Sequence, residues 1–289
     1  MKVGFLGTGL MGLPMAQRLL AANIDLVAYN RTPEKLAPLT DAGCAIAQTP
    51  QQVMAASECI ILMLSNADAI QNVLLSEPSR QYLAQRTVIQ MGTITPTESK
   101  AIKQEVVKAG GEYLESPVLG SIPEVEAGKL IVMVGASTEQ FQQWSNLLGN
   151  FGSLMHIGEV GTAAAVKLAL NQLIASLSSA FALSLSFVES QKIDVDVFMQ
   201  ILRNSALYAP TFDKKLQRMR DRNYSNPNFP TKHLLKDTNL FISEAKSLGL
   251  NVSSIEGVRQ ILEVAIDQGL SDADYSALFS AIAPQTSDT

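Results

Sequence analysis

The sequence has few of the residues that build metal sites and disulfide frameworks. Only Cys44 and Cys59 occur among 289 residues, and no CxxC is present. This excludes a disulfide framework and a cysteine-based zinc site. The two histidines, His156 and His233, cannot complete a zinc site alone. We therefore expect no metal and a reducing compartment.

Positive charge is also scarce. The chain has 22 Lys and Arg against 27 Asp and Glu, a formal net charge of -5, and no run of basic residues. Binding to nucleic acid would need a basic surface, so we expect no such partner. The opening MKVGFLG enters a strand pattern without a basic or apolar leader. We expect no secretory signal and a cytoplasmic protein.

One long stretch carries no charge. Residues 168–188 approach the length of a bilayer span but contain Asn171, Gln172 and several serines, without flanking basic or aromatic anchors. A buried central or subunit-interface helix therefore explains this stretch better than a membrane helix. A membrane-associated protein stays the alternative, and we expect no membrane contact.

A glycine loop follows the first apolar run, residues 3–6. In a GxGxxG pattern, one glycine permits a tight turn, one lets a pyrophosphate approach, and one lets helix pack against strand. A helix pattern and a second strand at residues 24–29 complete a βαβ unit, which favours dinucleotide binding over a plain turn. The predicted cofactor-binding residues of this loop are Gly7, Gly9, Leu10, Met11 and Gly12.

The end of the second strand selects between the two nicotinamide cofactors. An acidic residue there would bind the ribose 2′-hydroxyl and repel a 2′-phosphate. This chain has Asn30, Arg31 and Thr32 instead, which accommodate a phosphate, with Arg31 able to grip it. The alternative is a turn at Asn30 with a solvated Arg31. We predict NADP(H) as cofactor, with NADPH preferred over NADH.

Strand and helix patterns alternate up to about residue 160. Further strands are expected at residues 59–64, 87–91, 112–115 and 130–134, with a helix at 96–109. After that point every pattern is helical. The predicted fold class is α/β, with an N-terminal Rossmann-type doubly wound sheet followed by an all-helical C-terminal domain. The predicted boundaries are 1–160 for the NADP-binding domain and 161–289 for a helical substrate and oligomerisation domain.

In a doubly wound sheet the ligand lies beyond the carboxyl ends of the strands. The loops to consider are therefore 64–66, 92–94 and 116–121, although each could be a simple connection. The last one combines glycine with hydroxyl residues, so its backbone N–H groups could receive a carboxylate. Glu124 and Glu126 nearby resemble a catalytic acid pair, but alternating acids in a loop are usually solvated, which disfavours a glycosidase.

The second half opens with a long apolar helix, expected from residue 162 to about 191. Such a helix is buried in its own domain or against a partner subunit, so we expect a homodimer or homotetramer. Further helices are expected at 194–204, 211–221, 230–248 and 253–268, and a frayed end at 284–289.

Lys167 is unusual in this helix because its immediate neighbours are apolar. A lysine there needs water or a ligand for its ammonium group. One interpretation is that its side chain extends to solvent. The functional reading gives it a proton to donate to a carbonyl oxygen as hydride reaches the carbon. Asn171 lies four residues on, on the same helix face, and would hold the same substrate.

These residues together resemble the β-hydroxyacid dehydrogenase family, which includes 3-hydroxyisobutyrate dehydrogenase and the glyoxylate and succinic semialdehyde reductases. The resemblance covers nearly the whole chain. Its marks are Gly7 to Gly12, Thr93 with Pro96, Pro117-Val118, Gly158 and Gly161, Lys167 with Asn171, and Phe229 with Lys236-Asp237.

The resemblance implies roles that the residues alone do not settle. Lys167 would be the catalytic acid or base, Lys236 would close over cofactor or substrate, and Phe229 would flank the nicotinamide. Asn171 and the loop of Leu119, Gly120 and Ser121 would bind the substrate carboxylate. Cofactor contacts are also expected at Leu64, Ser65 and Thr93.

The chain departs from the family pattern at three places. Leu119 and Gly92 stand where serines are usual, and Ser121 stands where a second glycine is common. Glu115, where the hydroxyisobutyrate enzymes usually carry aspartate, and Asn30-Arg31-Thr32 resemble the NADPH-using glyoxylate and succinic semialdehyde branch. The loss of the hydroxyl at Leu119 makes the substrate pocket more apolar.

The expected function is therefore NADPH-dependent reduction of small aldehyde or keto acids, succinic semialdehyde and glyoxylate first, with Lys167 as proton donor. The enzyme class is an NADP-dependent β-hydroxyacid dehydrogenase or aldehyde reductase acting on CH–OH. Alternatives are 3-hydroxyisobutyrate dehydrogenase, a broad carbonyl reductase with imine-reducing side activity, and a non-catalytic NADP-binding scaffold.

Overall fold

The computed structural model describes residues 1–284, and the rest of the frayed end predicted from Pro284 lies outside the described residues. The chain divides into two compact units, Met1–Lys167 and Leu168–Thr289. The helix that begins at Thr162 runs through this division. Each unit has a hydrophobic core of its own, so each is described separately.

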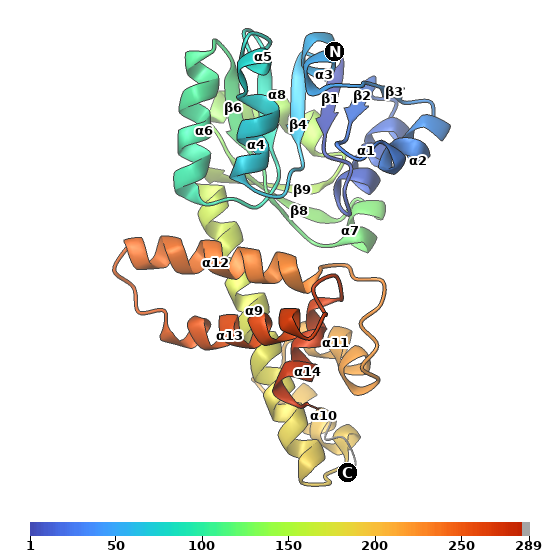
Figure 1. Ribbon diagram of the computed structural model, residues 1–289, viewed down its shortest axis with the longest axis vertical. Coiled ribbons are helices and arrows are strands. Elements are labelled where there is room, and N and C mark those ends of the chain that lie inside the picture. Colours follow the sequence, from blue (N-terminus) through green and yellow to red (C-terminus); the bar gives the residue numbers. More distant parts are fainter. Residues whose placement is uncertain (285–289) are drawn as a thin grey trace. The chain divides into compact units, whose positions relative to one another are not determined.

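The first unit is built on one sheet (Figure 1), with the strand order β3-β2-β1-β4-β5-β6-β8-β7 and with β9 paired to β8. The first six strands of this order pair in parallel, and β1 lies between β2 and β4, where the strand order reverses. That is a Rossmann-type doubly wound sheet, as predicted. The strands are β1 (Val3–Leu6), β2 (Leu26–Tyr29), β3 (Ala45–Ile46), β4 (Cys59–Leu62), β5 (Thr87–Gln90), β6 (Glu112–Glu115), β7 (Val118–Leu119), β8 (Leu130–Gly135) and β9 (Gly152–Gly158).

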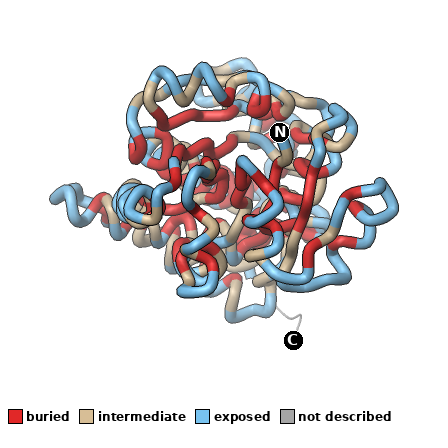
Figure 2. The backbone as a smooth tube through the Cα atoms, turned by 90° about the horizontal axis from the view of Figure 1, so that it is seen from above, coloured by how far each residue is buried: buried red, intermediate tan, exposed pale blue. Residues whose placement is uncertain are grey.

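Helices cover both faces of the sheet. Strand side chains alternate between the faces, so Phe5 and Ile61 enter one core while Leu6 and Ile60 enter the other. Helices α1, α2 and α8 cover the first core, and α3, α4 and α6 cover the second. Figure 2 shows the buried segments inside the exposed outer turns. The helical elements are α1 (Gly12–Ala21), η1 (Pro33–Leu36), α2 (Ala37–Asp41), α3 (Pro50–Ala56), α4 (Ala67–Leu74), α5 (Glu77–Arg80), α6 (Pro96–Lys108), α7 (Ile122–Glu126) and α8 (Thr138–Leu148).

The second unit is helical, as predicted. Its core joins aromatic and aliphatic side chains of α9 to the later helices, for example Phe181 stacked on Phe212 with ring centroids 4.7 Å apart. The elements are α9 (Thr162–Ser190), α10 (Val195–Arg203), α11 (Pro210–Arg220), α12 (Thr231–Ser247), α13 (Ser253–Asp267), η2 (Tyr275–Ala277) and α14 (Leu278–Ile282).

Helix α9 is only partly covered by its own chain. By length and composition it could cross a membrane, and 44% of its most apolar window is buried in the protein. Core helices of soluble proteins pass the same test. Leu183 and Phe187 are 62% and 63% exposed, so burial of the whole helix within its own unit is not what the structure shows. Leu183 and Phe187 thus belong to an apolar face of α9 that its own unit leaves exposed.

Candidate active site

The glycine loop has the form that a dinucleotide needs. Gly7 has a φ of +101°, which favours glycine, and a Cβ at Gly12 would lie 1.9 Å from the carbonyl oxygen of Gly7. A Cβ at Gly9, in contrast, would meet nothing within 4 Å. The hydroxyl of Thr8 is buried and has no hydrogen-bond partner within residues 1–284. Close packing of the turn, open space above it and an unpartnered polar atom fit a bound pyrophosphate.

Asn30 braces this loop from the end of β2. The Thr8 N–H donates to Asn30 Oδ1 at 3.1 Å, and Asn30 Nδ2 donates to the Thr32 carbonyl oxygen at 2.9 Å. Both ends of the Asn30 amide are thus engaged by backbone. Of the three residues predicted to accommodate a 2′-phosphate, Asn30 is half-buried, and Arg31 and Thr32 are exposed.

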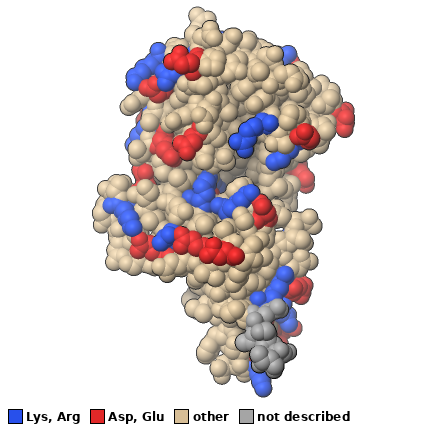
Figure 3. Space-filling model, viewed as in Figure 1, with Lys and Arg blue, Asp and Glu red and all other residues tan. Residues whose placement is uncertain are grey.

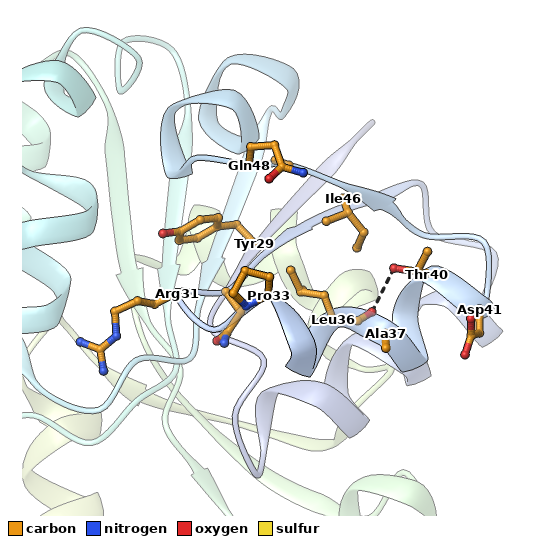
Figure 4. Close-up of a pocket in the computed structure, with 11 residues that line it drawn as sticks. Tyr29, Arg31, Pro33, Leu36, Ala37, Thr40, Asp41, Ile46 and Gln48 are labelled. Atoms are coloured by element: carbon orange, nitrogen blue, oxygen red, sulfur yellow. Dashed lines mark hydrogen bonds between the residues drawn. The ribbon is translucent and has the colours of Figure 1, made fainter.

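A pocket of about 330 Å³ lies beside the same residues (Figure 4). The end of the second strand is where such folds recognise the ribose next to adenine. The guanidinium of Arg31 extends away from α2 and from Asp41 (Figure 4), so the two charges do not pair. The pocket is lined by Tyr29, Asn30, Arg31, Pro33, Leu36, Ala37, Thr40, Asp41, Ile46, Ala47 and Gln48.

The loop after β4 contacts both the glycine loop and the loop after β5, because the carboxyl ends of neighbouring parallel strands lie at one edge of the sheet. A Cβ at Gly7 would lie 2.9 Å from Leu64 Cδ2, and a Cβ at Gly92 would lie 2.4 Å from the Leu64 carbonyl oxygen. The departure at Gly92 therefore has a steric reason, because a serine there would push the Leu64 backbone away. Leu64 and Ser65 follow β4, and Thr93 follows β5.

The loop after β6 is less open to anions than the sequence indicates. Ser121 donates to Glu124 Oε2 through both its backbone N–H, at 2.8 Å, and its hydroxyl, at 2.7 Å. Leu119, which pairs with Ile131 in the hairpin of β7 and β8, is half-buried. Glu126 is exposed, as predicted for a solvated acid, but Glu124 is half-buried and engaged, so that expectation was wrong for Glu124.

Glu115 anchors the start of α9 to the end of β6. Its side chain is 1% exposed, and its Oε1 accepts the backbone N–H groups of Gly161 and Ala164 at 2.8 and 3.0 Å. Ser99 donates its hydroxyl to Oε2, and a Cβ at Gly135 would lie 2.6 Å from Oε1, so only glycine leaves room. Burial raises the pKa of Glu115, against the lowering effect of these hydrogen bonds. The first turn of α9 is thus fixed just ahead of Lys167.

Lys167 and Asn171 lie one turn apart on α9, as predicted. Lys167 is half-buried and Asn171 is 2% exposed. Asn171 Nδ2 donates to Asp237 Oδ2 at 2.6 Å, and Lys236 Nζ lies 2.8 Å from Asp237 Oδ1. Asn171 Oδ1 is buried with no hydrogen-bond partner in the described part of the chain. Asp237 therefore connects two predicted site residues, Asn171 and Lys236. Asp237 was not predicted as a site residue, and its only signal in the sequence is its place beside Lys236.

Phe229 is held just before α12 begins. Its ring lies 5.8 Å from that of Tyr275, and the Tyr275 N–H donates to its carbonyl oxygen at 3.0 Å. The neighbouring Asp274 forms a buried ion pair with Lys215, at 2.7 Å. His233, whose ring lies 6.4 Å from that of Phe229, has a pKa lowered by burial and then by Lys236. Phe229 is therefore held by contacts within the helical unit.

Charged side chains of both signs lie on the face shown in Figure 3, some of them gathered in groups of one sign. Among residues 1–284, no group of three or more His, Cys, Asp or Glu side chains could hold a metal ion.

Comparison with known proteins agrees with this arrangement. Residues 2–161 match the family model of the NAD binding domain of 6-phosphogluconate dehydrogenase, and residues 161–282 match that of the NAD-binding domain of NADP-dependent 3-hydroxyisobutyrate dehydrogenase. The 2-hydroxy-3-oxopropionate reductase of Escherichia coli is 30% identical, over 98% of this chain and 97% of the relative. Glyoxylate/succinic semialdehyde reductase 2 of Arabidopsis thaliana is 29% identical, over 97% of this chain and 79% of the relative.

A solved structure shows the same fold. The crystal structure of 3-hydroxyisobutyrate dehydrogenase from Salmonella typhimurium superposes with a TM-score of 0.86 at 21% identity, covering 96% of this chain and 99% of the other. The family models and the Escherichia coli relative show the protein family as well as the fold. The chain belongs to the β-hydroxyacid dehydrogenase family and is an NAD(P)-dependent oxidoreductase that acts on CH–OH groups or the matching carbonyls.

Proposed function

We propose that this protein reduces small aldehyde or keto acids with NADPH, with succinic semialdehyde and glyoxylate as the first substrates to consider. The products are the corresponding hydroxy acids. The observation that carries this proposal is a half-buried lysine, Lys167, one helical turn from a buried and partly unpartnered Asn171. Two relatives are named for reduction of carbonyl acids of this size, which supports the substrate class.

Lys167 is the proton donor in this proposal. Bound NADPH supplies the hydride that the carbonyl carbon accepts. The Lys167 ammonium group hydrogen-bonds the carbonyl oxygen and transfers a proton to it, which neutralises the developing alkoxide. Asn171, oriented by its hydrogen bond to Asp237, holds the substrate beside Lys167. Leu119, Gly120 and Ser121 form the other proposed side of the substrate pocket.

The proposed cofactor contacts follow from the loops described above. Gly7, Gly9 and Gly12 make room for the pyrophosphate, with Leu10 and Met11 between them. Arg31 and Thr32 contact the 2′-phosphate, while Asn30 holds the loop in place. The remaining proposed contacts are Leu64, Ser65, Thr93, Phe229 and Lys236.

A second candidate function is reduction of bulkier or uncharged carbonyls, with imines as a side activity. The half-buried Leu119 and the engaged Ser121 favour it, since both reduce the polarity of the substrate loop. The reverse reaction on 3-hydroxyisobutyrate uses the same residues. A non-catalytic NADP-binding scaffold would need the glycine loop but not Lys167.

The assembly and location belong to the same proposal. We propose a homodimer or homotetramer in the cytoplasm, with the exposed apolar face of α9 as a contact surface. The functional boundary is proposed at residues 160 and 161, with a cofactor domain before it and a substrate and oligomerisation domain after it.

A panel assay tests the activity. NADPH and NADH consumption is measured against succinic semialdehyde, glyoxylate, methylmalonate semialdehyde and a cyclic imine, with 3-hydroxyisobutyrate and NADP+ for the reverse direction. We expect the fastest turnover with NADPH and one of the first two acids. Absence of turnover with every compound, despite NADPH binding, would favour the scaffold.

A further inference from the structure

We propose that the buried ion pair of Lys215 and Asp274 positions Phe229 for its contact with the cofactor. The pair lies within the helical unit, where it joins α11 to the N-cap residue of η2. This inference rests on the proposed function, in which Phe229 flanks the nicotinamide. It adds two positioning residues, which act on the reaction through Phe229.

Lys215 occupies a core position of its helix. The buried residues of α11 are Phe212, Lys215 and Met219, at the three- and four-residue spacing of a single helix face. Lys215 is 8% exposed, and burial lowers the pKa of its ammonium group, against the effect of Asp274. A charge on the apolar face of a helix costs free energy unless a partner compensates it.

Asp274 is the compensating partner. It is fully buried, and Lys215 Nζ donates to its two carboxylate oxygens at 2.7 and 2.8 Å. The same Nζ lies 4.1 Å from the ring centroid of Tyr275, which is a cation–π distance. Asp274 Oδ1 also accepts the N–H and the hydroxyl of Ser276, at 3.1 and 2.7 Å. These directional contacts fix the backbone of residues 274–276 together with the ring of Tyr275.

The fixed segment pairs with the residues ahead of α12. Pro230 and Asp274 form an antiparallel β-bridge. The Tyr275 N–H donates to the Phe229 carbonyl oxygen at 3.0 Å, and the two rings meet edge to face with centroids 5.8 Å apart. Lys215 therefore reaches both the backbone and the ring of Phe229 through one neighbour, Tyr275.

A stable core does not by itself require an ion pair here. Apolar side chains of similar volume often replace a buried ion pair without loss of stability. What they lack is direction, because dispersion contacts let a segment shift more easily than charge-assisted hydrogen bonds do. A displacement of about 1 Å at a reacting group can cost on the order of a hundredfold in rate. The ion pair is therefore a device for placing Phe229.

Replacing both partners by neutral side chains tests this role. Lys215→Met combined with Asp274→Asn, the neutral replacement, leaves no lone charge in the core. Arg203→Met combined with Asp213→Asn is the matched control, because it removes an exposed ion pair of the same 2.7 Å length between α10 and α11. For the neutral replacement we expect kcat to fall about tenfold or more, with thermal unfolding and NADPH affinity nearly unchanged. The control should match the wild type.

A double-mutant cycle shows whether the ion pair acts through Phe229. In a Phe229→Ala background, the neutral replacement should lower kcat by less than about twofold further, because the ring that it positions is already absent. A purely structural role would give the same loss in both backgrounds. Equal losses, or an unchanged kcat when Phe229 is present, would overturn the inference.

A single substitution covers the case in which the neutral replacement does not fold. Lys215→Gln keeps an N–H donor for Asp274 but carries no charge. It is then measured in the same two backgrounds, and the same two outcomes decide the matter.

The fluorescence emission of bound NADPH separates this inference from the proposed activity, because it reports the surroundings of the nicotinamide. If the wild type reduces none of the compounds in the panel, the proposed function fails. Emission closer to that of free NADPH in both the neutral replacement and Phe229→Ala would still support the positioning role. Emission equal to that of the wild type in the neutral replacement would refute it.

Discussion

The three polar residues that follow β2 have different surroundings, and this decides what each can do. Asn30 is bonded to the backbone of Thr8 and Thr32, so it holds the glycine loop. Arg31 is exposed and extends away from α2 (Figure 4). A guanidinium in that position gains most from a phosphate, because it offers charge and paired donors together.

Arg31→Ala is expected to reduce kcat/KM for NADPH about tenfold or more while leaving kcat/KM for NADH nearly unchanged, since only NADPH carries the 2′-phosphate. Steady-state kinetics with both cofactors measure this. Lys35→Ala removes an exposed cation from the adjoining 3-10 helix and serves as the matched control. An unchanged cofactor ratio in Arg31→Ala would refute the assigned role of Arg31.

For single residues, the sequence predicts which positions belong to a site better than it predicts their hydrogen-bond partners. The glycine spacing predicted the cofactor loop, and the structure gives a steric reason for Gly7 and Gly12 and open space at Gly9. The engagement of Ser121 by Glu124 was not predicted, because Ser121 was expected to bind a substrate carboxylate and Glu124 to be solvated, although their spacing is that of a capping pair. The hydrogen bonds of Asn30 to the backbone of Thr8 and Thr32 were not predicted either, because an amide at this position is equally able to face a phosphate.

Among the elements, α9 depends on how its first turn is fixed. Glu115, at the end of β6, accepts two backbone N–H groups of this turn and a hydroxyl from α6. A helical side chain lies over the turn that precedes its own Cα, so Lys167 lies over the turn that Glu115 holds. The position of the proposed proton donor is therefore set by a buried carboxylate of the sheet.

Glu115→Ala is expected to destabilise the protein by about 3 kcal/mol, because it leaves three buried donors without their acceptor. The first thermal transition should fall by roughly 6–12 °C. Glu115→Gln keeps an acceptor oxygen and should lose much less. Glu112→Ala, an exposed position at the other end of β6, is the control. Equal transition temperatures for Glu115→Ala and Glu112→Ala would contradict the anchoring role.

Several elements could be predicted from the sequence almost to the residue, and others were missed. The expected strand at 112–115 and the helices at 96–109 and 253–268 agree with β6, α6 and α13 to within a residue at each end. The two-residue strands β3 and β7 were missed, because so short a run carries no periodicity. β9 was missed because its residues are largely exposed at the end of the sheet, although it pairs in parallel with β8.

For the whole molecule, the change from alternating to purely helical patterns predicted two units, and the structure divides at Lys167. What the sequence could not supply is contact between distant positions. Asn171 meets Asp237 across 66 residues of chain, and no local pattern indicates such a pair. The family resemblance named Lys236 as a site residue, and the structure adds the carboxylate that joins it to Asn171.

The most direct test of the central claim is the turnover of Lys167→Met with NADPH and its best carbonyl substrate, measured beside NADPH binding by fluorescence. Methionine keeps an unbranched side chain but has no proton to donate. We expect kcat to fall about a hundredfold or more with NADPH affinity unchanged, and Lys108→Met, an exposed position on α6, to match the wild type. An unchanged kcat in Lys167→Met would contradict the account.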